Sequence, residues 1–252
     1  MEAETPLVSI VTPAFRAERF IGATIRSVQS QSLPRFEMLV VDDCSPDDTA
    51  GVVAAMAAED SRIVLLRHER NGGPAAARNT ALASARGRYI AFLDSDDLWL
   101  PAKLERQLGF MTERGAAISF TRYRRIAEDG APVSAVIGVP DRLDYRGLLK
   151  NTAIVTSTVV VDRELTGPFA MRKVYIDDFV LWLELLKRGF SAHGLQEELT
   201  HYRVVTASHS RNKLRSALQV WRTYRDIEHL GLVSAAWALS HYAWHAFWKY
   251  RR

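Results

Sequence analysis

Three aspartates stand within four positions at the end of an apolar run: Asp94, Asp96 and Asp97 follow Tyr89–Leu93. A buried strand that ends at carboxylates places them at the edge of a sheet, where ligands bind in open α/β folds. Carboxylates this close repel one another unless a cation lies between them, and a hard divalent cation takes oxygen ligands and shares a substrate's phosphates. The alternative is a solvent-exposed turn in which Asp97 is the N-cap of the short segment Leu98–Leu100. The cluster alone does not decide between these two interpretations.

Two more acidic pairs occupy positions where the chain changes from one element to the next. Asp42 and Asp43 end the apolar run Phe36–Val41, and Asp177 and Asp178 begin a segment whose apolar residues indicate one face of a helix. Strand-end acids commonly accept hydrogen bonds from nearby backbone N–H groups. Acids in a first helical turn are stabilised by the helix dipole, by less than about 1 kcal/mol. A carboxylate in either place is also suited to ligand binding or to general base catalysis.

The first hundred residues alternate between strand and helix patterns. Short apolar or β-branched runs predict strands, and longer runs with helical spacing or many alanines predict helices. The alternation indicates βαβ units in a mostly parallel sheet with right-handed crossovers, so the acids that follow two of the strands are expected at the same edge. Two later segments have strand composition and extend the sheet. The expected strands are Leu7–Val11, Phe36–Val41, Arg62–Leu66, Tyr89–Leu93, Ile118–Tyr123 and Thr156–Val161, and the expected helices are Phe20–Val28, Thr49–Ala58 and Ala75–Ala85.

The composition is that of a globular chain with a lopsided charge. The 252 residues are 48% hydrophobic and 25% charged, which excludes a disordered protein and allows one large domain or a domain with a subdomain. Cys44 is the single cysteine, so no intramolecular disulfide is expected and a reducing, cytosolic setting fits. The apolar run after the acidic N-terminus is too brief for a signal peptide. Net charge is +4, but the last fifty residues are strongly basic, which indicates nucleic acid or a membrane surface as a partner.

Taken in order, the motifs resemble the nucleotide-binding half of a GT-A glycosyltransferase of the large inverting family 2. The resemblance rests on segments 8–15 (VSIVTPAF), 40–49 (VVDDCSPDDT), 71–79 (NGGPAAARN), 94–97 (DSDD) and 175–182 (YIDDFVLW). It implies an α/β GT-A fold, Rossmann-like with a mostly parallel sheet flanked by helices, and a C-terminal helical extension. The expected domains are a catalytic domain 1–212, divided into a nucleotide-binding half 1–100 and an acceptor half 101–212, and an extension 213–252.

The resemblance also implies a divalent metal at the first acidic cluster. Asp94, Ser95 and Asp96 match the family's DxD motif, in which the acids bind Mn²⁺ or Mg²⁺ and neutralise the leaving diphosphate. Asp96 is expected to be the more direct metal ligand, while Asp94 reaches the ribose or a metal-bound water. Asp97 lies outside the motif, and its N-cap interpretation is preferred.

The second acidic pair matches the part of the family that recognises a nucleotide base. Asp43 corresponds to the acid that hydrogen-bonds the base edge of uridine, and Asp42 is the alternative base contact. The backbone of the first strand end lines the same pocket in the family, which here is Thr12, Pro13 and Ala14.

Asp178 matches the family's general base, which takes a proton from the acceptor hydroxyl. The pair that contains it is usually Glu-Asp in the family and is Asp177-Asp178 here, so the first side chain is one methylene shorter and the resemblance assigns no role to Asp177. Arg78, at the start of the alanine-rich helix, either contacts the diphosphate or ribose or forms an ion pair with the acidic edge, and the sequence favours neither.

Residues 202–213 resemble a loop that follows the catalytic domain in a branch of the family that serves bacterial surface polysaccharides and teichuronic-type polymers. In that branch the loop that matches 202–213 folds over the bound donor, so His209, in preference to His201, or Arg211 is expected to complete the metal or phosphate shell. Two helices, 214–230 and 232–248, follow. The second is too short and too polar to span a bilayer, and its tryptophans beside terminal basic residues favour a helix in the membrane interface. The alternative is an amphipathic helix packed on the catalytic domain or on a second copy in a homodimer.

Together these features predict an inverting, metal-dependent glycosyltransferase that is peripheral on the cytoplasmic face of a bacterial inner membrane. Its expected donor is a nucleotide sugar, with UDP favoured, and its expected acceptor is a glycan linked to polyprenyl diphosphate. A non-catalytic sugar-nucleotide-binding scaffold is the main alternative, against which Asp178 argues. A receiver domain would not need the second acidic edge at Asp94, a dehalogenase-like phosphatase would place its nucleophile strand first, and the basic tail contains no recognised nucleic-acid-binding module.

Overall fold

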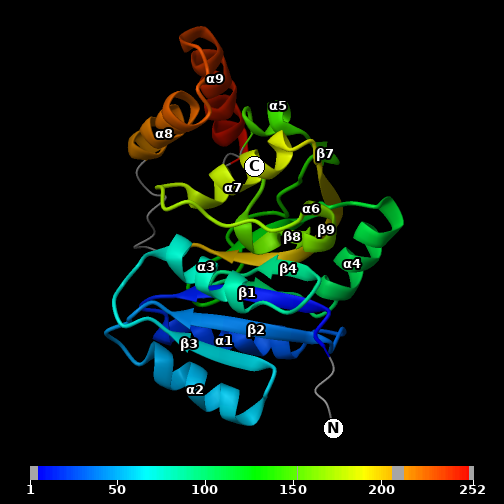
Figure 1. The fold of residues 1–252 in the computed structure, drawn as a ribbon, viewed down its shortest axis with the longest axis vertical. Coiled ribbons are helices and arrows are strands. Elements are labelled where there is room, and N and C mark those ends of the chain that lie inside the picture. Colours follow the sequence, from blue (N-terminus) through cyan, green and yellow to red (C-terminus); the bar gives the residue numbers. More distant parts are fainter. Residues whose placement is uncertain (1–4, 152, 206–212, 250–252) are drawn as a thin grey trace.

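The computed structural model of the chain describes residues 5–151, 153–205 and 213–249, with the side chains of 213–215 and 246–249 left out. In this part the chain forms a nine-stranded sheet with helices on both faces, and two further helices stand at one end of the molecule (Figure 1). The strand order is β3-β2-β1-β4-β8-β6-β9-β5, and β7 pairs with β9. The predicted α/β architecture with a mostly parallel sheet is confirmed.

The first half is built from the predicted βαβ units. β1 pairs in parallel with β2 and β4, and β2 pairs in parallel with β3, so all four strands end at the same edge. Every residue of β2 is buried, as is typical of a parallel strand that is covered on both faces. The bounds are β1 Val8–Ala14, α1 Glu18–Gln29, β2 Phe36–Asp42, α2 Thr49–Glu59, β3 Ile63–Arg67, α3 Pro74–Ser84 and β4 Tyr89–Phe92.

The sheet separates two hydrophobic cores. The helices α1, α2 and α4 cover one face, and α1 contributes Ile21, Ile25 and Val28, which recur at helical spacing. On the other face lie α3 and α7 (Figure 1), and the small residues Ala77 and Ala81 of α3 are fully buried against the strands. The two cores hold β4 from both sides and thereby fix the point at which the chain leaves it for Asp94.

The second half changes strand direction. β8 is antiparallel to β4 and to β6, whereas β6 and β9 are parallel, and the short strands β5 and β7 are antiparallel to β9. Its bounds are β5 Leu98–Trp99, α4 Lys103–Arg114, β6 Ile118–Ile126, β7 Arg142–Leu143, α5 Tyr145–Leu148, η1 Thr156–Thr158, β8 Val160–Asp162, α6 Arg163–Thr166, α7 Asp177–Lys187 and β9 Ala192–Arg203.

Two local expectations for this half are wrong. Thr156–Thr158 form a 3₁₀ turn, and the strand that was expected to include them begins only at Val160. Leu98–Trp99 form the edge strand β5 and not the start of a helix, because they pair with Thr200 and His201 of β9. The first error arises because the partners of Thr156–Thr158 supply no local sequence pattern. The second arises because the residues that pair with β5 are about a hundred positions away in the chain.

The C-terminal extension packs on the helices and turns that precede it. It consists of α8 Lys213–Arg222, a π-helical turn Thr223–Ile227 and α9 Leu232–Lys249. Tyr224 is fully buried, and its hydroxyl donates to the carbonyl of Leu149. The carboxylate of Glu228 accepts from Tyr145 Oη at 2.5 Å and pairs with Lys187 Nζ at 2.6 Å. One face of the extension therefore belongs to the same core as α7, as in the packing alternative for the last helix.

The opposite side of these helices exposes large apolar residues. Leu218, Leu232, Val233, Trp237 and Trp244 are each more than half exposed. None of the helices in the described part is long and apolar enough to cross a membrane. The structure thus gives the extension one packed face and one apolar face that is open to solvent.

Candidate active site

The base-recognition candidate Asp43 lies just after β2 and is almost fully buried, at 2% exposure. Its carboxylate oxygens accept from the backbone N–H groups of Gly72 at 2.8 Å and Gly73 at 2.7 Å. The ring of His68 contacts it at 2.7 Å through Nδ1, and Nε2 of the same ring lies 2.8 Å from Thr80 Oγ1. Asp43 therefore holds the turn that starts α3, where Gly73 adopts a positive φ of 86° that favours glycine.

The C-terminal end of β1 pairs with the end of β2 at Asp42, so it lies beside the base-recognition candidate Asp43. Pro13 pairs with Val41 and Ala14 with Asp42 in the parallel register. The hydroxyl of Thr12 is buried without a hydrogen-bond partner in the described part of the chain. A buried hydroxyl left unpaired is unfavourable, so this atom is available to a water or a ligand. Asp42 accepts a weak bond from Ser45 N–H at 3.3 Å and stays at the strand end.

The DxD residues follow β4 at the same edge of the sheet. Asp94 is partly accessible, with 30% of its side chain exposed. Ser95 is held through its carbonyl, which accepts from Thr24 Oγ1 at 3.0 Å. Burial and the neighbouring charge of Asp94 raise the pKa of Asp96 to about 6. The two carboxylates are thus held close enough to oppose each other's ionisation, which a cation between them would relieve.

Arg78 joins two of the predicted motifs. Its Nη2 donates to Asp94 Oδ1 at 2.6 Å and its Nη1 to Asp177 Oδ2 at 3.1 Å. Burial alone would lower the pKa of this guanidinium, but the charges of Asp94, Asp177 and Asp178 outweigh it and raise the pKa above its usual range. Of the two roles left open for Arg78, the structure shows the ion pair with the acidic edge.

Asp177 and Asp178 occupy the first turn of α7, as predicted. Asp178 is partly buried; its Oδ1 accepts from the N–H of Phe179 at 2.7 Å and its Oδ2 from Thr156 Oγ1 at 2.5 Å. Asp177 accepts from Arg78 and from the N–H of Asp178. Burial raises the pKa of Asp177 to about 6, and the charge of Asp178 adds to this effect while Arg78 opposes it.

Asp97 does not cap a helix, so the interpretation preferred from the sequence is wrong. The residue is fully buried, and its carboxylate accepts from Ser157 Oγ at 2.5 Å and from Arg203 N–H at 2.7 Å. Burial and the charges of Asp96 and Asp94 raise its pKa well above the usual range. Asp97 therefore faces inward, into the sheet, and not toward solvent.

Sequence reasoning missed several residues that hold this edge together. His68 was not among the predicted site residues, nor were Arg203, Thr156 and Ser157. Their partners lie 22 to 107 positions away in the chain, so no local spacing could have shown these contacts. His209 and Arg211 fall outside the described residues. His201 is described, and its Nε2 lies 3.1 Å from Glu198 Oε1.

The donor set at this edge suits a hard divalent cation. Asp94 and Asp96 offer carboxylate oxygens, which are the ligands that Mn²⁺ and Mg²⁺ prefer. Within the described residues no three His, Cys, Asp or Glu side chains form a metal-binding group. A cation here would therefore take further oxygens from outside these residues, as from a substrate diphosphate or water.

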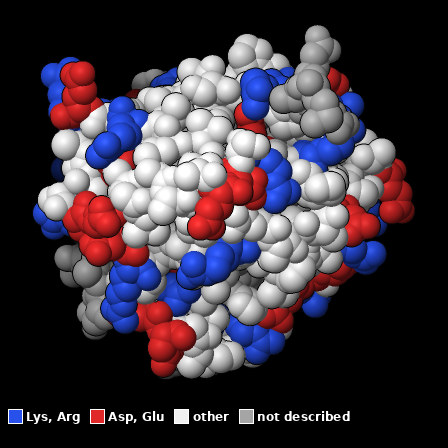
Figure 2. Space-filling view, turned by 90° about the horizontal axis from the view of Figure 1, so that it is seen from below, with Lys and Arg blue, Asp and Glu red and all other residues white. Residues whose placement is uncertain are grey.

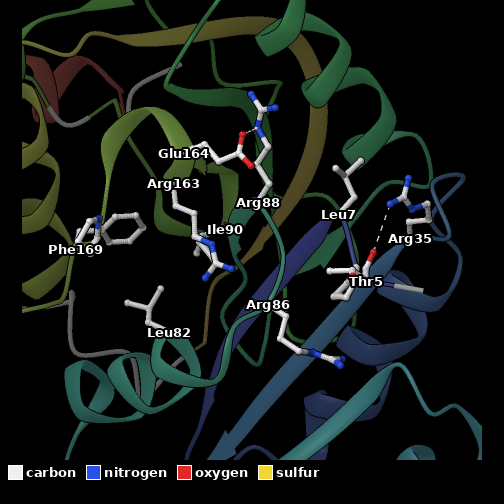
Figure 3. Close-up of a pocket in the computed structure, with 12 residues that line it drawn as sticks. Thr5, Leu7, Arg35, Leu82, Arg86, Arg88, Ile90, Arg163, Glu164 and Phe169 are labelled. Atoms are coloured by element: carbon white, nitrogen blue, oxygen red, sulfur yellow. Dashed lines mark hydrogen bonds and ion pairs between the residues drawn. The ribbon is translucent and has the colours of Figure 1, made fainter. Parts of the chain in front are cut away.

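A cavity of about 610 Å³ lies at the opposite edge, where β1 and β4 begin (Figure 3). Arg35, Arg86, Arg88 and Arg163 line it, but Figure 3 shows their guanidinium groups pointing in different directions. Arg86 pairs with Glu37, and Arg88 pairs with Asp162 and Glu164. On the face seen in Figure 2, basic and acidic side chains are likewise interspersed. The predicted site residues that the structure describes lie at the acidic edge of the sheet and do not line this cavity.

Comparison with known proteins identifies the family of the chain. The profile of the family described as Glycosyl transferase family 2 matches residues 9–177. The chain belongs to glycosyltransferase family 2. The match ends at Asp177, so it contains the nucleobase candidates, the DxD acids and Arg78 of this glycosyltransferase, whereas Asp178, His209 and Arg211 lie beyond it.

Curated relatives resemble the glycosyltransferase over most of their length. It is 46% identical over 245 residues to the putative teichuronic acid biosynthesis glycosyltransferase TuaG of Bacillus subtilis, covering 97% of each chain. It is 40% identical over 221 residues to the Escherichia coli enzyme WfgD, a UDP-Glc:α-D-GlcNAc-diphosphoundecaprenol β-1,3-glucosyltransferase, covering 87% of this chain and 86% of the other. The expected surface-polysaccharide branch of the family is confirmed by these relatives.

Solved structures confirm the GT-A fold of the glycosyltransferase. S. aureus TarS 1–349 in complex with UDP-GlcNAc superposes with a TM-score of 0.73 at 19% identity, covering 94% of this chain and 71% of that one. The mannosyltransferase PcManGT of Pyrobaculum calidifontis, in complex with GDP-Man and Mn²⁺, gives a TM-score of 0.70 at 20% identity, covering 96% and 74%. At this level of identity the likeness concerns the fold.

Proposed function

We propose that this glycosyltransferase is a metal-dependent, inverting enzyme that transfers a sugar from a UDP-sugar to a lipid-linked glycan in the synthesis of a cell-surface polysaccharide. The observation that carries the proposal is the direct connection between its motifs. Arg78 bridges Asp94 and Asp177. Thr156 donates a hydrogen bond to Asp178. Ser157, the next residue in the same turn, donates to Asp97 and accepts from the Asp94 N–H. Metal ligands and base are thereby held in one constellation.

The proposed division of labour follows the edge of the sheet. Asp43 and the end of β1 take the base of the nucleotide, and Asp94 and Asp96 face the diphosphate. A divalent cation bound by these carboxylates neutralises the charge that develops on the leaving diphosphate. Ser95 keeps the two acids at the loop tip through its bonded carbonyl.

Asp178 acts as the general base in this proposal. Its Oδ2 accepts a short hydrogen bond from Thr156 Oγ1, which orients the carboxylate. The carboxylate takes the proton of the acceptor hydroxyl while the oxygen attacks the anomeric carbon from the side opposite the diphosphate. Such a direct displacement inverts the anomeric configuration.

The substrate classes come from the relatives. WfgD uses UDP-Glc and an acceptor linked to diphosphoundecaprenol, TuaG is named for teichuronic acid biosynthesis, and TarS was solved with UDP-GlcNAc. A lipid-linked acceptor also fits a protein that rests on the cytoplasmic face of the membrane. The exposed apolar residues of α8 and α9 supply a surface for such contact, with tryptophans suited to the interface.

Replacing Asp178 by asparagine tests the catalytic proposal. The amide can still accept from the N–H of Phe179, so the first turn of α7 is kept. We expect turnover of a UDP-sugar with a GlcNAc-diphosphoundecaprenol acceptor to fall roughly 100-fold or more, because a general base contributes about that much. Calorimetry should show donor binding unchanged.

Asp144→Asn is the matched control, because Asp144 also accepts from a first-turn N–H, at the start of α5, away from the acidic edge. It should retain activity. Normal turnover by the Asp178 variant would remove the base assignment. Donor binding by the native enzyme without any transfer would favour the non-catalytic scaffold instead.

A further inference from the structure

Asp97 has no part in the proposed transfer step, yet it is the most deeply buried acid of the cluster. Its exposure is 0%, and both carboxylate oxygens are engaged. Oδ2 accepts from Ser157 and Oδ1 from the backbone of Arg203, so the side chain joins the turn before β8 to the end of β9. Burying a carboxylate costs free energy unless hydrogen bonds compensate for the lost water.

Ser157 connects Asp97 to Asp94, the first of the two proposed metal ligands. Its Oγ donates to Asp97 at 2.5 Å and accepts from the backbone N–H of Asp94 at 3.1 Å. The hydroxyl is fully buried, so water does not compete for it. The position of the Asp94 backbone is thus set through a single buried hydroxyl that Asp97 orients.

Arg203 connects Asp97 to Asp96, the second proposed metal ligand. Its backbone N–H is held by Asp97, and its Nε donates to the carbonyl of Asp96 at 2.7 Å. Its Nη1 donates to the carbonyls of Ala127 at 3.1 Å and Glu128 at 2.8 Å, which fixes the far end of the guanidinium. The residue is 6% exposed. The Asp96 backbone is therefore clamped from the strand end that Asp97 secures.

We propose that Asp97 is a positioning residue for the divalent-cation site, which acts through Ser157 on Asp94 and through Arg203 on Asp96. Two carboxylates that repel each other tend to move apart, and a cation binds tightly only when their spacing is set beforehand. The buried chain Asp94–Ser157–Asp97–Arg203–Asp96 closes a ring through the backbone of the motif and opposes that movement. This inference rests on the proposed function, in which Asp94 and Asp96 bind the cation.

The test compares Asp97→Asn and Ser157→Ala with the native enzyme by calorimetry of UDP binding at increasing Mn²⁺. Asparagine keeps the shape but reverses the polarity of the contact to Ser157, and alanine removes one buried hydroxyl, so this second variant is expected to fold. We expect the Mn²⁺ concentration for half-maximal UDP binding to rise about 10-fold to 100-fold, as when groups that orient metal ligands are lost. Binding of uridine without metal should be unchanged in both variants.

Asp162→Asn is the matched control, since Asp162 is equally buried but lies at the opposite end of β4, where it binds Arg88. It should leave the Mn²⁺ dependence as in the native enzyme. If Asp96→Ala loses metal-dependent binding while the Asp97 and Ser157 variants keep native Mn²⁺ dependence, the positioning role is refuted and the metal site stands. If the native enzyme binds UDP equally with and without metal, the proposed metal site itself fails, and the positioning role fails with it.

Discussion

Arg78 shows at the level of single residues how the site reconciles burial with charge. The guanidinium is 6% exposed and contacts carboxylates from two motifs that are more than eighty positions apart in the chain, Asp94 and Asp177. Buried carboxylates without a cation would be strongly destabilising. Even so, the pKa of Asp177 lies at about 6, because burial outweighs the nearby guanidinium. Ionisation of Asp177 thus lowers the stability of the folded protein.

The pKa of Asp177 predicts a pH-dependent difference between the native protein and Asp177→Asn. The amide still accepts from Arg78 but does not titrate. A folded-state pKa of about 6 against an ordinary value of 3.8 means that the native protein is stabilised below pH 3.8 and loses that stabilisation as pH rises through 6. The variant should therefore gain stability relative to the native protein between pH 4 and pH 7, by about 3 kcal/mol at most.

Denaturant unfolding at several pH values, without divalent ions, measures this difference. Asp144→Asn, which replaces an exposed capping acid away from Arg78, serves as the control substitution. A difference that stays flat from pH 4 to pH 7, or that favours the native protein as pH rises, would contradict the prediction.

At the scale of the elements, β4 is held by both cores and by its two neighbouring strands, β1 and β8. Its approach depends on Gly87, where an added Cβ would lie 2.6 Å from Ser9 N and 2.7 Å from Val8 C in the backbone of β1. The Gly87 N–H also donates to Ser9 Oγ at 2.8 Å. Glycine is therefore required at this point for β4 to pair with β1 and deliver Asp94 to the carboxyl edge.

Gly87→Ala should destabilise the fold by about 2 kcal/mol or more, because rigid backbone must move to admit the methyl group. Gly109→Ala is the matched control: Gly109 is exposed in α4 and an added Cβ meets nothing within 4 Å. That change should stabilise the helix by about 0.5–1 kcal/mol. Thermal unfolding of both variants decides the matter, and equal effects of the two substitutions would show that the close approach to β1 does not matter.

The elements also show which structure could be foreseen from the sequence. The strands and helices of residues 8–84 follow from local periodicity, and the placement of Asp43, Asp94 and Asp178 follows from ordered motifs. The two-residue strand β5 and the turn at Thr156–Thr158 could not be foreseen, because pairing with β9 and hydrogen bonds to Asp178 and Asp97 define them. Asp97 was misassigned for the same reason, since a helix cap is a local pattern whereas Arg203 lies 106 positions away.

At the scale of the whole molecule, the C-terminal helices have one face in the core and one face exposed. Val220, Tyr224, Ala235 and Ala238 are buried with α7, and Phe179 of α7 lies edge-on to Tyr242 with ring centroids 6.0 Å apart. Removing the extension would thus uncover the part of the core that surrounds α7. Point substitutions on the exposed face are the sharper test of a membrane contact.

The double variant Val233→Ser/Trp244→Ser should weaken sedimentation with anionic liposomes roughly tenfold or more, because each large apolar group contributes about 1.5–3 kcal/mol when it leaves water. Leu165→Ser, at a half-exposed leucine on α6, is the control and should sediment as the native protein does. Undiminished liposome binding by the double variant would exclude this face as the contact. A change in oligomeric state in place of liposome binding would assign the face to a second copy of the chain.

The anchoring of Tyr224 to the Leu149 carbonyl has a geometric result for catalysis at a lipid surface. Because α8 and α9 stand at the end of the molecule away from β3 and α2 (Figure 1), a bilayer beneath α9 would leave the nucleotide half in water, where free donor diffuses. The height of Asp178 above the lipid would then be a fixed property of the fold and not of a flexible tether. Under the proposed function, the enzyme would select glycans whose reactive hydroxyl lies at that height above the diphosphate of the lipid.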